Sequence, residues 1–162
     1  MNLSKYIYLI ITFIFIGNIN ITTANEELIP LKDLLKQQNL RSPIGKLNYL
    51  ADFSLQCGSL FQAINEVMPN NNILIASINL QEGAIITKIM IKKTEQRKIK
   101  KEIENRKTYL KNKYAELLNK NKNINGDYIK GSESLSNDEI MCKKFVPRFY
   151  KFLKSNSFTI KK

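Results

Sequence analysis

Cys57 and Cys142 are the only cysteines in the chain of 162 residues, and a disulfide between them is the covalent chemistry that the sequence offers most directly. Such a bond would enclose about 86 residues and stabilise the fold by up to about 4.5 kcal/mol through the lost entropy of the unfolded chain. A reducing cytosol would instead leave two buried thiols, so the outcome depends on the compartment. A redox-active pair is disfavoured, because the chain lacks a Cys-x-x-Cys motif and no neighbour obviously lowers a thiol pKa.

The N-terminal residues indicate the compartment, because they have the composition of a cleavable export signal. Lys5 provides the positive start, residues 6–16 form an apolar run, and residues 22–24 are small enough for a signal peptidase. The run is shorter than the roughly 20 apolar residues that span a bilayer. We therefore expect residues 1–24 to be removed and the mature chain to be periplasmic or secreted, with the two cysteines bonded. A signal anchor that is never cut is the alternative.

The sequence offers little for metal binding or acid–base catalysis. It contains no His, which removes the commonest general base and the commonest transition-metal ligand. No Gly-rich phosphate loop appears either, so no metal and no cofactor are expected. Asp52 and Glu66 fall on related faces of one predicted helix, but a separation of ~21 Å along the axis is too great for joint catalysis. An enzyme of unrecognised type that uses Asp52 or Glu66 remains an alternative, and Asp138 and Glu139 are interpreted as helix-cap residues.

A basic run between residues 92 and 107 is the candidate for noncovalent chemistry. Residues 25–91 carry a net charge of −1, whereas residues 92–162 carry +12. A field of one sign attracts anionic partners, which outside the cytoplasm would be an envelope polymer, a lipid surface or an acidic protein. Nucleic acid is not expected, because aromatic side chains do not interleave with the cations. The anion-binding candidates are Lys92, Lys93, Arg97, Lys98, Lys100, Lys101, Arg106 and Lys107.

The same run has a second interpretation as the solvated face of a helix in a Lys-rich chain. Glu102 and Glu104 would then form weak local ion pairs with their basic neighbours. Peripheral membrane binding is a further possibility, because a membrane-surface helix carries bulky apolar anchors beside its cations. The residues that could serve as anchors are Ile85, Ile86, Ile89 and Ile91.

The spacing of apolar residues predicts an all-α fold of about four helices that would position these groups. We expect a short N-terminal helix near residue 31, a central buried helix over 44–68, a long basic amphipathic helix over 84–119 and a C-terminal helix over 136–154. Residues 73–82 fit a strand or a helix, and helix is favoured because no partner strand is evident.

Local signals place the ends of these helices. Ser42 followed by Pro43 predicts the start of the central helix, and Ser136 with Glu139 predicts a capping box for the last one. The long helix would measure roughly 54 Å, so one end should project or pair with a second copy as a homodimer. Residues 119–135 are expected to form a flexible loop.

The sequence thus predicts a signal peptide over 1–24, one helical domain over 25–154 and a flexible C-terminal tail over 155–162. The leading hypothesis is an exported, non-enzymatic binding protein whose cationic helix holds an anionic partner. A structural protein that oligomerises through its long helix is the main alternative.

Overall fold

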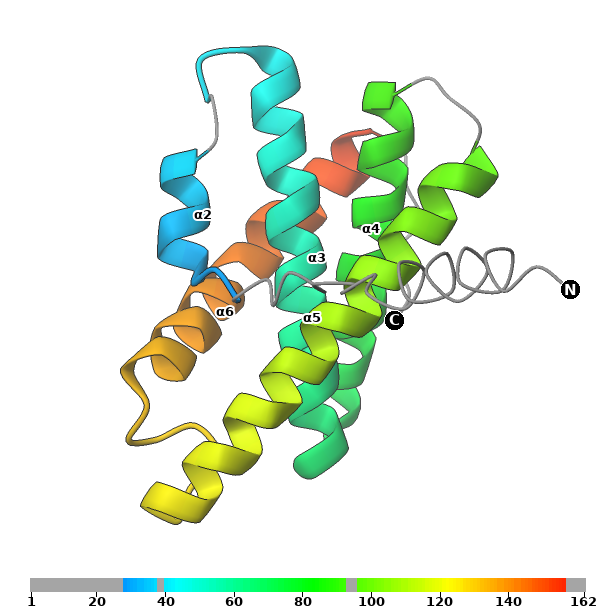
Figure 1. Ribbon diagram of the computed structural model, residues 1–162. Coiled ribbons are helices and arrows are strands. Elements are labelled where there is room, and N and C mark those ends of the chain that lie inside the picture. The colour runs from blue at the N-terminus through cyan, green and yellow to red at the C-terminus, as the bar shows by residue number, and fades with distance from the viewer. Residues whose placement is uncertain (1–27, 38–39, 93–95, 157–162) are drawn as a thin grey trace, which may run out of the picture.

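The computed structural model describes residues 28–37, 40–92 and 96–156, and every regular element among them is a helix. The prediction of an all-α fold is therefore confirmed, and residues 73–82 are helical. The predicted signal peptide and residues 157–162 lie outside the described residues. Figure 1 shows the five described helices, which are α2 (Leu31–Gln37), α3 (Pro43–Val67), α4 (Asn71–Lys92), α5 (Gln96–Asn125) and α6 (Glu133–Ser155).

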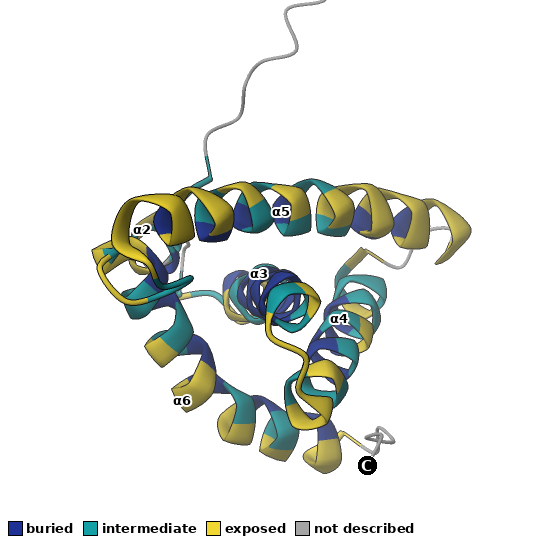
Figure 2. Cartoon of the chain, turned by 90° about the horizontal axis from the view of Figure 1, so that it is seen from below, coloured by how far each residue is buried: buried dark blue, intermediate teal, exposed yellow. Residues whose placement is uncertain are grey.

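Helix α3 is the central element, as its two apolar faces predict. Figure 2 shows α4, α5 and α6 arranged around it, and residues 53–61 in the middle of α3 are all buried. The Ser42 hydroxyl caps the helix by accepting a hydrogen bond from the Gly45 N–H at 2.9 Å, and Pro43 occupies the first turn. Phe53 and Leu55 are two residues apart and therefore lie on different faces of the helix, and both are buried.

Helix α4 lies against α3 at Gly58. A Cβ atom on Gly58 would lie only 2.8 Å from Cγ of Gln81, so a larger residue would push the helices apart. The Ser77 hydroxyl and the Gln81 amide both donate to the Gly58 carbonyl, at 2.8 and 3.2 Å. By length and composition alone α4 could also cross a membrane, a criterion that core helices of bundles meet as well.

The prediction of one helix over 84–119 is wrong, because the chain reverses between α4 and α5. Lys92 at the end of α4 forms an ion pair with Glu102 in α5 at 2.9 Å, which shows that α5 folds back. This reversal buries Ile99 and Ile103 against Leu55 and Ala84, so the apolar face of this part of α5 is covered within the molecule. Helix α5 is about 45 Å long, shorter than the 54 Å expected.

The prediction of a flexible loop over 119–135 is also wrong. Helix α5 continues to Asn125 and ends at Gly126, which has a φ of +73° that favours glycine. The Asn121 amide donates to the carbonyls of Asp127 and Lys130, both at 2.9 Å, and the Asp127 carboxylate accepts two backbone N–H groups of the same turn. These bonds hold the short connection to α6.

The N-cap of helix α6 lies four residues earlier than predicted. It is Ser132, whose hydroxyl accepts from the Leu135 N–H, and the Ser136 hydroxyl donates instead to the Ile129 carbonyl. Asp138 therefore lies inside the helix, where it is buried, and the interpretation of it as a cap residue is wrong. The helix continues through Pro147 to Ser155, and its buried face includes Cys142, Phe145, Phe149 and Leu153.

Candidate functional site

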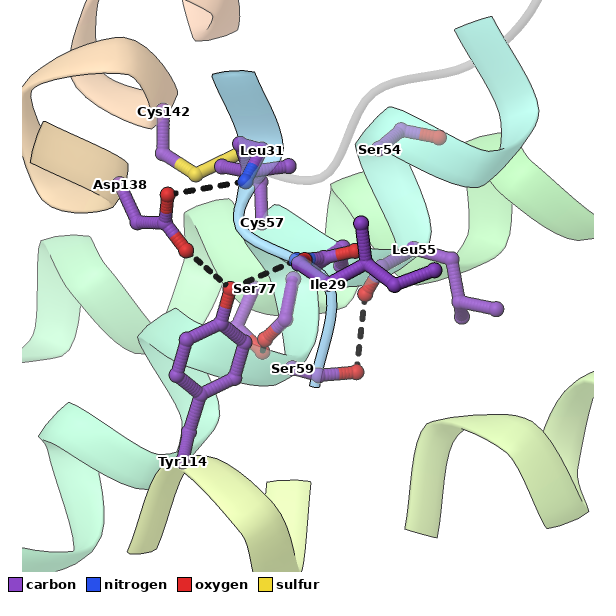
Figure 3. Close-up of a disulfide and its surroundings, with 12 residues drawn as sticks. Ile29, Leu31, Ser54, Leu55, Cys57, Ser59, Ser77, Tyr114, Asp138 and Cys142 are labelled. Carbon is purple, nitrogen blue, oxygen red and sulfur yellow. Dashed lines mark hydrogen bonds between the residues drawn. A yellow bond between two sulfur atoms is a disulfide. The ribbon is translucent and has the colours of Figure 1, made fainter. Parts of the chain in front are cut away.

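The predicted disulfide between Cys57 and Cys142 is present. It joins the middle of α3 to α6, with Cα atoms 5.4 Å apart and both side chains fully buried (Figure 3). Phe53 and Phe145, four residues before Cys57 and three after Cys142, pack with ring centroids 4.6 Å apart. The bond therefore closes the α3–α6 interface at a point that apolar side chains already fill.

A buried polar network lies beside the disulfide, and sequence analysis missed it. The Tyr114 hydroxyl of α5 donates to the Asp138 carboxylate of α6 at 2.7 Å and accepts from the Gln56 amide of α3 at 2.9 Å. Asp138 also accepts from the Leu31 N–H at 3.0 Å, and Gln56 donates to the Ile29 carbonyl at 2.7 Å (Figure 3). Four helices and the segment that precedes α2 are thus joined by one set of hydrogen bonds.

Both titratable groups of this network are shifted by burial. Burial raises the pKa of the Asp138 carboxyl above its ordinary value of 3.8, while the hydrogen bonds from Tyr114 and Leu31 act in the opposite direction. Burial, followed by the charge of Asp138, raises the pKa of the Tyr114 hydroxyl well above 10.0. Both side chains are almost completely buried, at 1% exposure each, so the network is a structural joint.

A sequence signal for this joint does exist. Asp138 and Cys142 are four residues apart, so on one helix they share a face, and Gln56 adjoins Cys57. A carboxylate on the same face as a buried cysteine is itself expected to be buried and to need donors. Which donors reach it depends on the packing of α5 and α2, and that packing is visible only in the structure.

The two carboxylates proposed for catalysis do not come together. Asp52 forms an ion pair with Lys88 of α4 at 2.7 Å, and Glu66 forms one with Lys111 of α5 at 3.1 Å. The two pairs tie α3 to different helices, Asp52 from its first half and Glu66 from its last turn. The arrangement therefore supports a packing role for each carboxylate.

The described residues offer no metal site beside these carboxylates. Within the residues that the structure describes, no three His, Cys, Asp or Glu side chains are placed to hold a metal ion. A hollow of about 260 Å³ lies at the α5–α6 connection, away from Asp52, and the Asn121 amide that lines it is already used by the turn. The residues that line it are Leu117, Lys120, Asn121, Ile124, Gly131 and Ser132.

The predicted anion-binding residues divide into two groups. Lys92 pairs with Glu102, the Arg106 guanidinium lies 5.0 Å from the ring centroid of Tyr109, and Lys107 pairs with Glu104; Lys93 lies outside the described residues. The other four are exposed and form no ion pair with a described carboxylate. These are Arg97, Lys98, Lys100 and Lys101, in the first two turns of α5.

The fold brings further residues to these four cations. Lys88 of α4 donates to the Asn48 side chain of α3 at 3.0 Å, so the start of α3 lies beside the end of α4, and the Lys92–Glu102 pair adds the start of α5. We call these segments, residues 41–48, 88–92 and 96–102, the basic end. They contain eight basic residues and one acidic residue. Sequence analysis missed the contribution of α3, which follows from the antiparallel packing of α3 and α4.

The cations at the start of α5 lie where a helix disfavours them. The N-terminus of a helix carries a partial positive charge, and a cation in its first turn costs about 0.3–1 kcal/mol. Arg97 and Lys98 are in that turn, which contains no acidic residue. Arg97 and Lys101 are also like charges four residues apart, and such a pair destabilises a helix slightly. Lys98 has one acidic neighbour on the helix, Glu102, whose pKa is lowered by the hydrogen bond from Lys92 and also by the charge of Lys98. The first turn itself offers Arg97 and Lys98 no acidic partner.

Comparison with known protein families, curated proteins and solved structures finds no match to this chain. The function is therefore inferred from its own residues and their arrangement.

Proposed function

We propose that the mature chain is an exported, disulfide-closed binding protein that holds an anionic partner through the cations of α5. The partner classes compatible with export are an envelope polymer, a lipid surface and an acidic protein. The observation that carries the proposal is the group of four exposed cations without an ion pair to a described carboxylate. The disulfide supports export, because such bonds persist in oxidising compartments.

Self-association through the long helix has less support. The apolar face of α5 is buried within the bundle, and its buried residues include Ile99, Ile103, Leu110 and Tyr114. A second copy would therefore have to use another face of α5.

The proposal predicts binding to anionic probes that weakens steeply as salt concentration rises. The probes are soluble polyphosphate and vesicles that contain phosphatidylglycerol. The double variant Lys100→Glu/Lys101→Glu should weaken vesicle binding about thirtyfold or more, since each cation near an anionic membrane contributes about 1 kcal/mol. Equilibrium binding at several salt concentrations measures this effect.

A charge-matched control separates location from net charge. Lys144 and Lys151 are exposed on α6 and form no ion pair with a described residue, so Lys144→Glu/Lys151→Glu gives the same net charge at a different surface. This control should retain most of the binding. Unchanged binding in the Lys100→Glu/Lys101→Glu variant, or a larger loss in the α6 variant, would contradict the proposal.

A further inference from the structure

Two exposed apolar side chains lie at the basic end. Ile44, in the first turn of α3, is 60% exposed, and Met90, near the end of α4, is 42% exposed. Asn48, one turn after Ile44, receives the hydrogen bond from Lys88, two residues before Met90, so both belong to the same end of the bundle. Figure 1 shows the start of α3 and the end of α4 at one end of the molecule.

Exposed side chains of this size in contact with water cost free energy that burial in a membrane interface would recover. A cationic surface that also presents bulky apolar side chains has the composition of a membrane-docking site, because the cations attract anionic head groups and the apolar groups enter the acyl boundary. A soluble polyanion would use the cations alone. The combination therefore favours a lipid surface over an envelope polymer.

The charge distribution favours this end of the molecule over the other. The opposite end, formed by residues 62–74 and 111–132, has five basic and three acidic residues, against eight and one at the basic end. It also exposes an isoleucine, Ile124, at 68%. Apolar exposure thus occurs at both ends, but only the basic end joins it to a strong positive charge.

From this arrangement we propose that the basic end docks on an anionic lipid surface, with Arg97, Lys98, Lys100 and Lys101 at the head groups and Ile44 and Met90 entering the interface. The inference rests on the proposed function and names the lipid surface as its partner. The bundle would then stand on the membrane by this end, while the disulfide and its network lie farther along α3.

The experiment uses the protein as purified from its own cells. It is sedimented with vesicles of phosphatidylcholine alone or of phosphatidylcholine mixed with phosphatidylglycerol. The unaltered protein should bind the mixed vesicles at least tenfold more tightly than the neutral ones. The double variant Ile44→Ser/Met90→Ser should weaken binding to mixed vesicles about tenfold, because each side chain loses part of its transfer free energy. Its binding to soluble polyphosphate should not change.

Ile124→Ser is the matched control, since it removes an equally exposed isoleucine from the other end and should leave vesicle binding unchanged. Circular dichroism and thermal unfolding check that the variants fold, as expected for side chains so exposed. If Ile44→Ser/Met90→Ser binds mixed vesicles as the unaltered protein does, or if the protein binds polyphosphate but not vesicles, the lipid inference is overturned and the proposed function stands. If Lys100→Glu/Lys101→Glu also binds both probes normally, both fail.

Discussion

At the scale of single residues, the hydroxyl of Tyr114 joins buried polar groups of two other helices. It donates to Asp138 and accepts from Gln56, and it comes from α5, whereas its partners come from α6 and α3. Without this hydroxyl, Asp138 would keep its bond from the Leu31 N–H and Gln56 its bond to the Ile29 carbonyl, but each would lose one buried hydrogen bond that water cannot replace. The side chain therefore contributes to stability through the groups it satisfies as well as through its ring.

Tyr114→Phe should lower the free energy of unfolding by about 1–3 kcal/mol, because Asp138 and Gln56 each lose a buried partner. Tyr109→Phe is the control: its hydroxyl is buried and makes no hydrogen bond with any described residue. Its loss should change stability little, and the ring that faces Arg106 is retained. Chemical denaturation of both variants measures the difference, and equal effects would show that the network contributes nothing measurable.

Asp138 should give stability a pH dependence of definite sign. Its folded pKa is raised by burial, so its contribution is fully present below the ordinary value of 3.8 and is lost as the pH rises through the raised folded pKa. Asp138→Asn removes the titration. The stability of the unaltered protein relative to this variant should therefore decrease from pH values below 3.8 upward. Denaturation at a series of pH values tests this; a difference that stays constant or grows with pH contradicts it.

At the scale of elements, the spacing of apolar residues predicted the features that depend on residues close together in the sequence. The two apolar faces of α3 predicted a central helix, because only a helix covered on all sides buries both. Ser42-Pro43 predicted its start, since a capping hydroxyl and a proline in the first turn act within a few residues. The helical state of residues 73–82 followed from the absence of a partner strand.

The errors of prediction occur where distant contacts decide. Apolar residues between Ile85 and Leu117 recur at helical spacing both before and after the break, so their spacing does not reveal that the chain reverses after Lys92. The polar stretch after residue 119 has the composition of a flexible linker. In the structure, however, the Asn121 side chain, one helical turn before Asn125, donates hydrogen bonds to two backbone carbonyls of the turn that follows. The basic end was predicted only in part for the same reason. Its lysines are visible in the sequence, but the sequence does not show that Ile44 and Met90 lie at the same end of the bundle as these lysines.

At the scale of the whole molecule, charge and covalent closure combine. A central helix, three helices around it and one disulfide form a framework in which, among the described residues, the Tyr109 hydroxyl is the one buried side-chain polar group without a hydrogen bond. The strongest excess of cations is left at one end. A partner outside the cytoplasm, whether a lipid surface or a polymer, can meet that end only if the chain is exported.

Intact-mass and N-terminal analysis of the protein from its own cells is the most direct test of this account. We expect a chain that begins at Asn25 and whose two cysteines are joined, so that its mass is lower than that of the reduced chain by two hydrogens. A protein that retains Met1 and carries free thiols at positions 57 and 142 would contradict the account.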